Sequence, residues 1–149
     1  MKKNTFKTIT LLFSTVLMPM LAQAKSVAGL WETIDDRSGQ KKAIVKLEKK
    51  NGSIEGTIVK VYFKPGDKHF CDDCTGSLKN APVEGLRFLW GLNKESKNHW
   101  NNGSILDPHN GKIYRARMNL QGDTIYVRAY LGVPVLGRTQ IWHRYQKAE

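Results

Sequence analysis

Beyond the first two dozen residues, apolar and polar side chains alternate along the chain in short runs. Ala43, Val45 and Leu47 are separated by a hydrophobic residue or a lysine, and residues 125–131 alternate in the same manner. A period of two places alternate side chains on opposite faces of a β-strand, whereas the three-to-four residue repeat of an amphipathic helix is not found over any long stretch. The sequence therefore predicts an all-β protein.

Turn residues divide this pattern into about eight strands. Asn51-Gly52 has the residues that a tight hairpin turn requires, because both tolerate positive φ. The predicted strands cover residues 29–34, 42–48, 54–63, 86–90, 103–107, 114–120, 125–131 and 138–145, with a polar excursion over 93–102. We expect a single antiparallel up-and-down β-barrel, because closure hides the sheet edges and the apolar face. At this strand number the interior is either filled by side chains or has room for one small ligand.

The first residues have the pattern of a secretory signal peptide. Lysines at positions 2, 3 and 7 precede an apolar run from about Ile9 to Leu21, and Ala22-Gln23-Ala24 is a small-x-small cleavage pattern. The apolar run is shorter than the roughly 20 residues that a membrane span requires. We expect a signal peptide at residues 1–24, a single β-barrel domain at residues 25–149, and export to the periplasm or beyond. No transmembrane segment is expected in the mature chain.

The net charge of the chain is +11, and removal of residues 1–24 takes away three lysines and no acid, which leaves +8. A basic protein associates loosely with anionic partners such as phosphorylated glycolipid or acidic polysaccharide, and nothing here predicts specific nucleic-acid binding. Arginine binds phosphate and carboxylate groups bidentately. Four arginines lie on neighbouring predicted strands and form either an ordinary solvated basic face or a clamp for a headgroup or carboxylate: Arg115, Arg117, Arg128 and Arg138.

The two cysteines, Cys71 and Cys74, lie two residues apart near His69, and three interpretations are open. In the oxidising compartment that an exported protein reaches, a nearby pair usually forms a disulfide, and this is the interpretation that we favour. A metal site would have His69, Cys71 and Cys74 as candidate ligands, but structural zinc normally takes four. A redox centre needs a low-pKa thiolate, which the two aspartates between the cysteines disfavour.

Several motifs resemble known families. Gly29-Leu30-Trp31 at the start of the first predicted strand and Arg144 at the end of the last one resemble the Gly-x-Trp and terminal-arginine pattern of lipocalins and their barrel relatives. This resemblance implies that Trp31 plugs one end of the barrel and that Arg144 packs over it. Stacking of a guanidinium on an indole gives the pair a physical reason.

A second set of motifs extends over nearly the whole mature chain. Its members are Gly29–Trp31, Cys71–Cys74, Pro82–Leu86, Gly103–Pro108, Asn110–Tyr114, Val127–Tyr130 and Leu136–Trp142. Together they resemble the secreted bacterial family catalogued as domain of unknown function 2147. The resemblance implies a small calycin-like β-barrel in the periplasm or beyond, with no established catalytic residue to carry over.

No catalytic motif is found in the sequence, so we expect neither an enzyme nor a cofactor. The leading hypothesis is a barrel that binds a small amphipathic or lipid-like ligand in its cavity. The candidate cavity residues are Trp31, Phe88, Trp90, Tyr114, Met118 and Tyr130. The alternative is a filled barrel that acts as a cell-envelope interaction or assembly factor through its basic surface. The apolar segment Leu131–Gly137 is either a buried loop over one barrel end or a hydrophobic lip at a cavity mouth.

Overall fold

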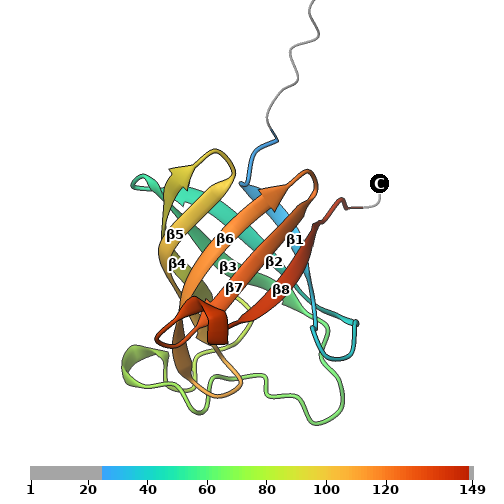
Figure 1. The fold of residues 1–149 in the computed structure, drawn as a ribbon. Helices are drawn as coiled ribbons and strands as arrows, with labels where there is room; N and C mark the ends of the chain where they lie inside the picture. The colour runs from blue at the N-terminus through green and yellow to red at the C-terminus, as the bar shows by residue number, and fades with distance from the viewer. Residues whose placement is uncertain (1–24, 148–149) are drawn as a thin grey trace, which may run out of the picture.

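The chain forms a closed barrel in which eight antiparallel strands pair in sequence order (Figure 1). This computed structural model describes residues 25–147. The strands are β1 (Gly29–Ile34), β2 (Lys41–Lys50), β3 (Ser53–Val61), β4 (Arg87–Ser96), β5 (His99–Asp107), β6 (Lys112–Gln121), β7 (Thr124–Tyr130) and β8 (Arg138–Arg144). β8 pairs with β1, which places Arg144 opposite Trp31. The predicted antiparallel up-and-down barrel is confirmed.

The two ends of the barrel carry different connections. At the short-turn end lie the start of β1 and the β2–β3, β4–β5 and β6–β7 turns. The opposite end, which we call the loop end and which is the lower one in Figure 1, carries the β3–β4 connection (residues 62–86) and the β7–β8 connection (residues 131–137). These connections contain the 3₁₀ turns η1 (Gly76–Leu78) and η2 (Pro134–Leu136). Asn51 and Gly52 have φ angles of 48° and 84°, as the turn prediction requires.

The polar excursion predicted over residues 93–102 is instead the tip of a long hairpin. β4 continues to Ser96 and β5 begins at His99, with Lys94 paired to Trp100. Asn98 takes a φ of 66° in the turn between them. Residues 93–97 are exposed, so they show no apolar alternation. Backbone pairing in the sheet nevertheless continues through them, because the ladder needs main-chain groups rather than apolar side chains.

Large apolar side chains fill the central interior of the barrel. The most deeply buried are Trp31, Trp142, Leu47, Leu89, Leu92, Ile125, Val45 and Val127. A Cβ atom added at Gly103 would lie 2.5 Å from Leu92 Cγ, and one added at Gly56 would lie 3.0 Å from both Leu47 and Leu89. Small residues are required at these two positions because neighbouring side chains already occupy the space. The interior is therefore closely packed around Gly56 and Gly103.

A β-bulge changes which side chains of β4 face inward. The register between β3 and β4 shifts at Phe88, so that Phe88 is an extra residue in β4. Phe88 and Leu89 are consequently both buried, although they are neighbours in sequence. Trp90 follows and lies on the outer face, paired with Ser104 of β5.

The predicted signal peptide at residues 1–24 lies outside the described residues. Within residues 25–147, no helix has the length and apolar character needed to cross a membrane.

Candidate functional site

The short-turn end is closed by the tryptophan and arginine that the sequence singled out. The guanidinium carbon of Arg144 lies 4.3 Å from the ring centroid of Trp31. Arg144 Nε donates to Asp123 Oδ1 over 2.8 Å, and its Nη2 donates to the Ser26 carbonyl oxygen over 2.7 Å. Hydrogen bonds from Lys25 and Arg144 lower the pKa of Asp123. This end is thus a polar seal over a buried indole.

The structure divides the six predicted cavity residues between the two faces of the barrel wall. Four face inward: Trp31, Phe88, Tyr114 and Met118. Trp31, Phe88 and Met118 belong to the packed core, whereas Tyr114 is half-buried towards the loop end. Trp90 lies on the outer face near Arg87, and Tyr130 lies on the outer face beneath the β7–β8 connection. The six residues therefore do not line one cavity.

Three of the four candidate clamp arginines share the outer face of the wall. Arg115 and Arg117 of β6 and Arg128 of β7 have the register opposite to that of the buried core positions, and Arg117 is paired directly with Arg128. Arg138 has the inward register, opposite Ala129, and its Nη2 donates to Asp36 over 2.7 Å. The structure therefore brings Arg117 and Arg128 together and places Arg138 elsewhere.

Arg117 and Arg128 line an open groove of about 330 Å³ on the outer wall over β4 to β8. A β-bulge lies at the groove, where Asn101 and Asn102 of β5 are opposite Arg117 alone in β6. Asn102 has a φ of 61°. The remaining lining residues are Glu95, His99, Trp100, Asn101, Met118, Asn119, Tyr126 and Thr139. Sequence reasoning missed this groove, although the Asn101-Asn102-Gly103 run is a signal for irregular strand geometry.

The two groove arginines carry charge without an acidic partner. Arg128 donates from Nε to the Pro134 carbonyl oxygen over 2.6 Å, from Nη1 to Thr139 Oγ1 over 2.8 Å and from Nη2 to the Val135 carbonyl oxygen over 3.0 Å. All three acceptors are neutral. In the part of the chain that the structure describes, no ion pair involves Arg117 or Arg128. Like charges directly opposite each other on neighbouring strands repel.

The groove also contains a histidine and a carboxylate, each held by its own neighbours. His99 Nδ1 lies 3.0 Å from the Lys97 carbonyl oxygen, and Glu95 accepts a weak hydrogen bond from Asn101 over 3.5 Å. Both side chains are exposed, and no hydrogen bond joins them among residues 25–147. The geometry gives no observation that carries an acid–base reaction.

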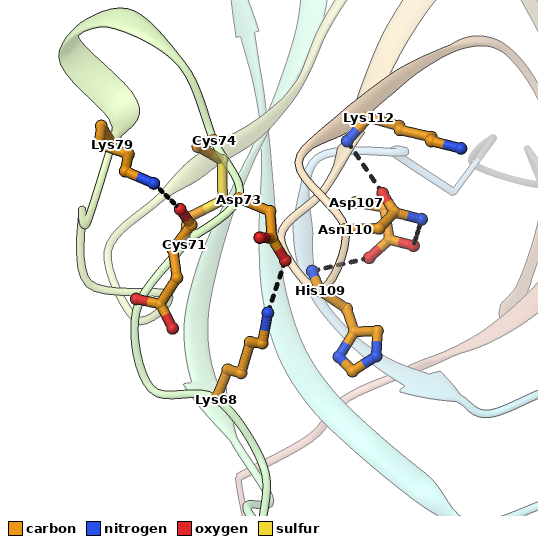
Figure 2. Close-up of polar contacts among 10 residues, drawn as sticks. Lys68, Cys71, Asp73, Cys74, Lys79, Asp107, His109, Asn110 and Lys112 are labelled. Atoms are coloured by element: carbon orange, nitrogen blue, oxygen red, sulfur yellow. Dashed lines mark hydrogen bonds and ion pairs between the residues drawn. A yellow bond between two sulfur atoms is a disulfide. The ribbon is translucent and has the colours of Figure 1, made fainter.

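The cysteine loop is joined by a disulfide and packs against the β5–β6 turn at the loop end (Figure 2). The Cα atoms of Cys71 and Cys74 are 5.3 Å apart. Lys68 Nζ donates to Asp73 over 2.5 Å, and this hydrogen bond lowers the pKa of Asp73. Gly111 of the turn has a φ of +68°, and a Cβ atom there would lie 2.1 Å from the Asp73 carbonyl oxygen. The disulfide loop is therefore held in close contact with the turn.

The alternative metal site does not assemble around these cysteines. Their sulfur atoms are bonded to each other, and the His69 ring stacks on Phe63 with ring centroids 3.9 Å apart. Within residues 25–147 no group of three or more His, Cys, Asp or Glu side chains is arranged to hold a metal ion.

Comparisons with known proteins agree with this architecture. Residues 29–144 match the family described as an uncharacterized protein conserved in bacteria, domain of unknown function 2147. The chain belongs to this family. A solved structure from Helicobacter pylori, described as belonging to the lipocalin family, is similar with a TM-score of 0.70 and 20% sequence identity, over 82% of this chain and 84% of that chain. At that identity the likeness shows the fold alone. A comparison with curated proteins found no match.

Proposed function

We propose that this family member is a non-catalytic binding protein of the cell envelope, and that its groove on the outer wall takes an anionic, phosphate- or carboxylate-bearing ligand. The observation that carries the proposal is the direct pairing of Arg117 with Arg128 in a groove where neither has an acidic partner among the described residues. The basic charge of the chain supports the same class of ligand.

An anion between the two guanidinium groups would remove their mutual repulsion. Arg128 uses three of its N–H directions on neutral acceptors, which hold its side chain in place, and Arg117 has its guanidinium carbon 5.7 Å from the Tyr130 ring centroid. A positioned guanidinium loses little conformational freedom when it binds, and charge-assisted hydrogen bonds to oxyanions are about twice as strong as neutral ones. Asn119 in the groove offers a further amide donor.

The packed interior gives less support to a ligand inside the barrel. The leading expectation from the sequence was an amphipathic molecule in a central cavity, yet Trp31, Met118 and Leu92 are among the side chains that fill this space. The filled-barrel alternative, in which the basic surface makes the contacts, fits the groove and the packing together. We therefore place the ligand on the wall.

The test is a titration of the ¹⁵N-labelled mature protein with inorganic phosphate, followed by two-dimensional NMR. We expect shift changes at the amides of β6 and β7 around the groove. Arg117→Gln should weaken binding by about tenfold, the equivalent of one charge-assisted hydrogen bond. Arg115→Gln is the matched control, because Arg115 is on the same strand and the same face but does not line the groove; it should change the affinity by less than about threefold.

Binding should also weaken as potassium chloride is raised, since salt screens exposed charges. If Arg117→Gln and Arg115→Gln lowered the phosphate affinity equally, binding would depend only on the overall charge of this face. In that case the groove would not be the site.

A further inference from the structure

The β7–β8 connection presents the most concentrated exposed apolar surface in the described part of the chain. Its side chains Leu131, Val133, Val135 and Leu136 are 59%, 52%, 79% and 79% exposed. The other large apolar side chains with comparable exposure are dispersed over four separate elements: Val59, Phe70, Ile113 and Ile141. Single exposed apolar residues are ordinary, whereas a cluster within six successive residues marks a contact surface.

The backbone of this connection is fixed against the barrel wall, and its aliphatic side chains point into solvent. Arg128 binds the carbonyl oxygens of Pro134 and Val135, and η2 forms a further turn within the connection. Gly137 approaches the wall so closely that a Cβ atom there would lie 2.6 Å from the Ala129 carbonyl oxygen. The connection covers Tyr130, which is 7% exposed, and turns its own aliphatic groups outward.

The charges around the connection are complementary to an anionic surface. No residue from 129 to 137 is charged. Arg128 links the connection to the groove, and Arg117 lies beside Arg128 on the same face. Aliphatic side chains flanked by arginines are the combination that binds a bilayer interface, where the apolar groups enter the acyl boundary and the cations meet the headgroups.

We infer that the occupant of this surface is an anionic lipid bilayer, with Val135 and Leu136 inserted below the headgroups and a headgroup phosphate bound in the groove. The inference rests on the proposed function, because it identifies the anion that binds in the groove as a lipid headgroup phosphate. A folded protein partner fits less well, since a stable protein interface uses about 20 to 30 residues a side. Six successive residues with purely aliphatic and Gly/Pro character supply far less than that.

The experiment is co-sedimentation of the mature protein with vesicles of phosphatidylcholine alone and of phosphatidylcholine with 30 mol% phosphatidylglycerol. We expect binding to the anionic vesicles that exceeds binding to the neutral ones by at least about tenfold. The double substitution Val135→Ser with Leu136→Ser should lower the partition coefficient by about a hundredfold, as two buried aliphatic side chains are lost. Val59→Ser, at an exposed position on β3, is the matched control and should leave the partition coefficient within about twofold.

Folding and phosphate binding are measured for the same proteins. The loop substitutions change exposed side chains and keep the main-chain carbonyl oxygens that Arg128 binds. Circular dichroism should therefore be unchanged, and the inorganic phosphate titration should match that of the wild type. Loss of vesicle binding with intact phosphate binding in the double variant supports the inference. Wild-type protein that binds phosphate but neither type of vesicle overturns the inference and leaves the proposed function standing.

Three other outcomes separate the alternatives further. If the double variant binds anionic vesicles as well as wild type does, the connection is not the inserting element and the inference fails. If light scattering shows a wild-type dimer that the double variant loses, the occupant is a second copy of this chain and the bilayer is excluded as the partner. If vesicle binding requires the connection while phosphate does not bind at all, the groove proposal fails and the apolar contact alone remains.

Discussion

Asp35 fixes the turn between β1 and β2 through one carboxylate oxygen. Its Oδ1 accepts hydrogen bonds from the Ser38 backbone N–H over 2.7 Å, the Ser38 hydroxyl over 2.8 Å and the Arg37 backbone N–H over 3.1 Å. The Ser38 backbone bond, followed by the Ser38 hydroxyl, lowers the pKa of Asp35 from 3.8 to about 2. A short side chain that bonds the backbone two or three residues ahead is typical of a turn.

This lowered pKa predicts a specific dependence of stability on pH. The folded-state pKa lies below the unfolded value, so the stabilisation is complete above pH 4 and is lost as the pH falls towards 2. Asp35→Asn should remove this part of the acid sensitivity and lower stability at pH 7 by about 1 kcal/mol, after allowance for screening at an exposed turn. Thermal unfolding from pH 7 to pH 2 measures both effects.

Glu48→Gln provides a control at an exposed carboxylate on β2 that forms an ion pair with Lys46. The Glu48→Gln protein should lose stability between pH 4 and pH 2 as the wild type does, because Asp35 is still present. An Asp35→Asn protein with the same pH profile as the wild type would mean that the turn does not depend on the charged carboxylate.

At the scale of elements, the β5–β6 turn and the disulfide loop form one packed unit at the loop end. Gly111 is the contact point, because only a residue without a Cβ atom fits against the Asp73 carbonyl oxygen. Within the turn, Asn110 Oδ1 accepts from the Lys112 backbone N–H and Asp107 Oδ1 accepts from the His109 backbone N–H, each over 2.9 Å (Figure 2). These hydrogen bonds fix the conformation of the turn, and the disulfide loop packs against it.

Replacement of Gly111 by alanine should separate the loop from the turn. Gly122→Ala is the matched control, since Gly122 also has a positive φ of +60° but has no atom within 4 Å of an added Cβ. Gly122→Ala should cost about 1 kcal/mol of unfolding free energy from backbone strain. Gly111→Ala should cost about 2 kcal/mol more, because the added methyl group overlaps the loop backbone. Urea unfolding compares the two, and equal costs would contradict the tight contact.

The arrangement of β4 illustrates why strand faces are harder to predict than strands. Leu86, Phe88 and Trp90 have one sequence parity, and a regular strand would place all three on one face. The bulge at Phe88 instead turns Leu89 inward and Trp90 outward. The need for a bulge arises from the register with β3, which no local pattern in β4 specifies.

For the whole molecule, the filled interior can be tested where packing is tightest. A Cβ atom at Gly103 would lie 2.5 Å from Leu92 Cγ, so these residues of β5 and β4 share one volume. Gly103→Ala should cost about 1 to 3 kcal/mol through overpacking, and Leu92→Ala about 2 to 5 kcal/mol through a cavity. The double variant should cost at least about 1 kcal/mol less than the sum, because the new methyl group occupies the cavity.

Urea denaturation of the four proteins in this cycle gives the interaction free energy between the two positions. Additive effects would show that the interior has free space beside Leu92. That outcome would return the barrel interior to consideration as the ligand site.

The sequence by itself determined the class of fold and several local features. Alternation with a period of two, together with the Asn51-Gly52 turn, is a local signal, and it predicted the antiparallel barrel of eight strands that the structure shows. Trp31 and Arg144 also stack at one barrel end, as their resemblance to the lipocalin pattern implies. The end of β4 was missed as strand because residues 93–97 are exposed and show no apolar alternation.

Only the tertiary structure decided the faces, the filling and the site. Trp90 lies outside because the register of β4 shifts against β3, and Tyr130, on the outer face of β7, is buried only because the β7–β8 connection covers it. Arg138 is separated from Arg117 and Arg128 by its inward register. Whether a barrel of eight strands is full depends on how side chains distant in sequence, such as Leu92 and Gly103, meet across strands. Periodicity gives the direction of a side chain along one strand, whereas contacts between strands arise only when register and closure are set.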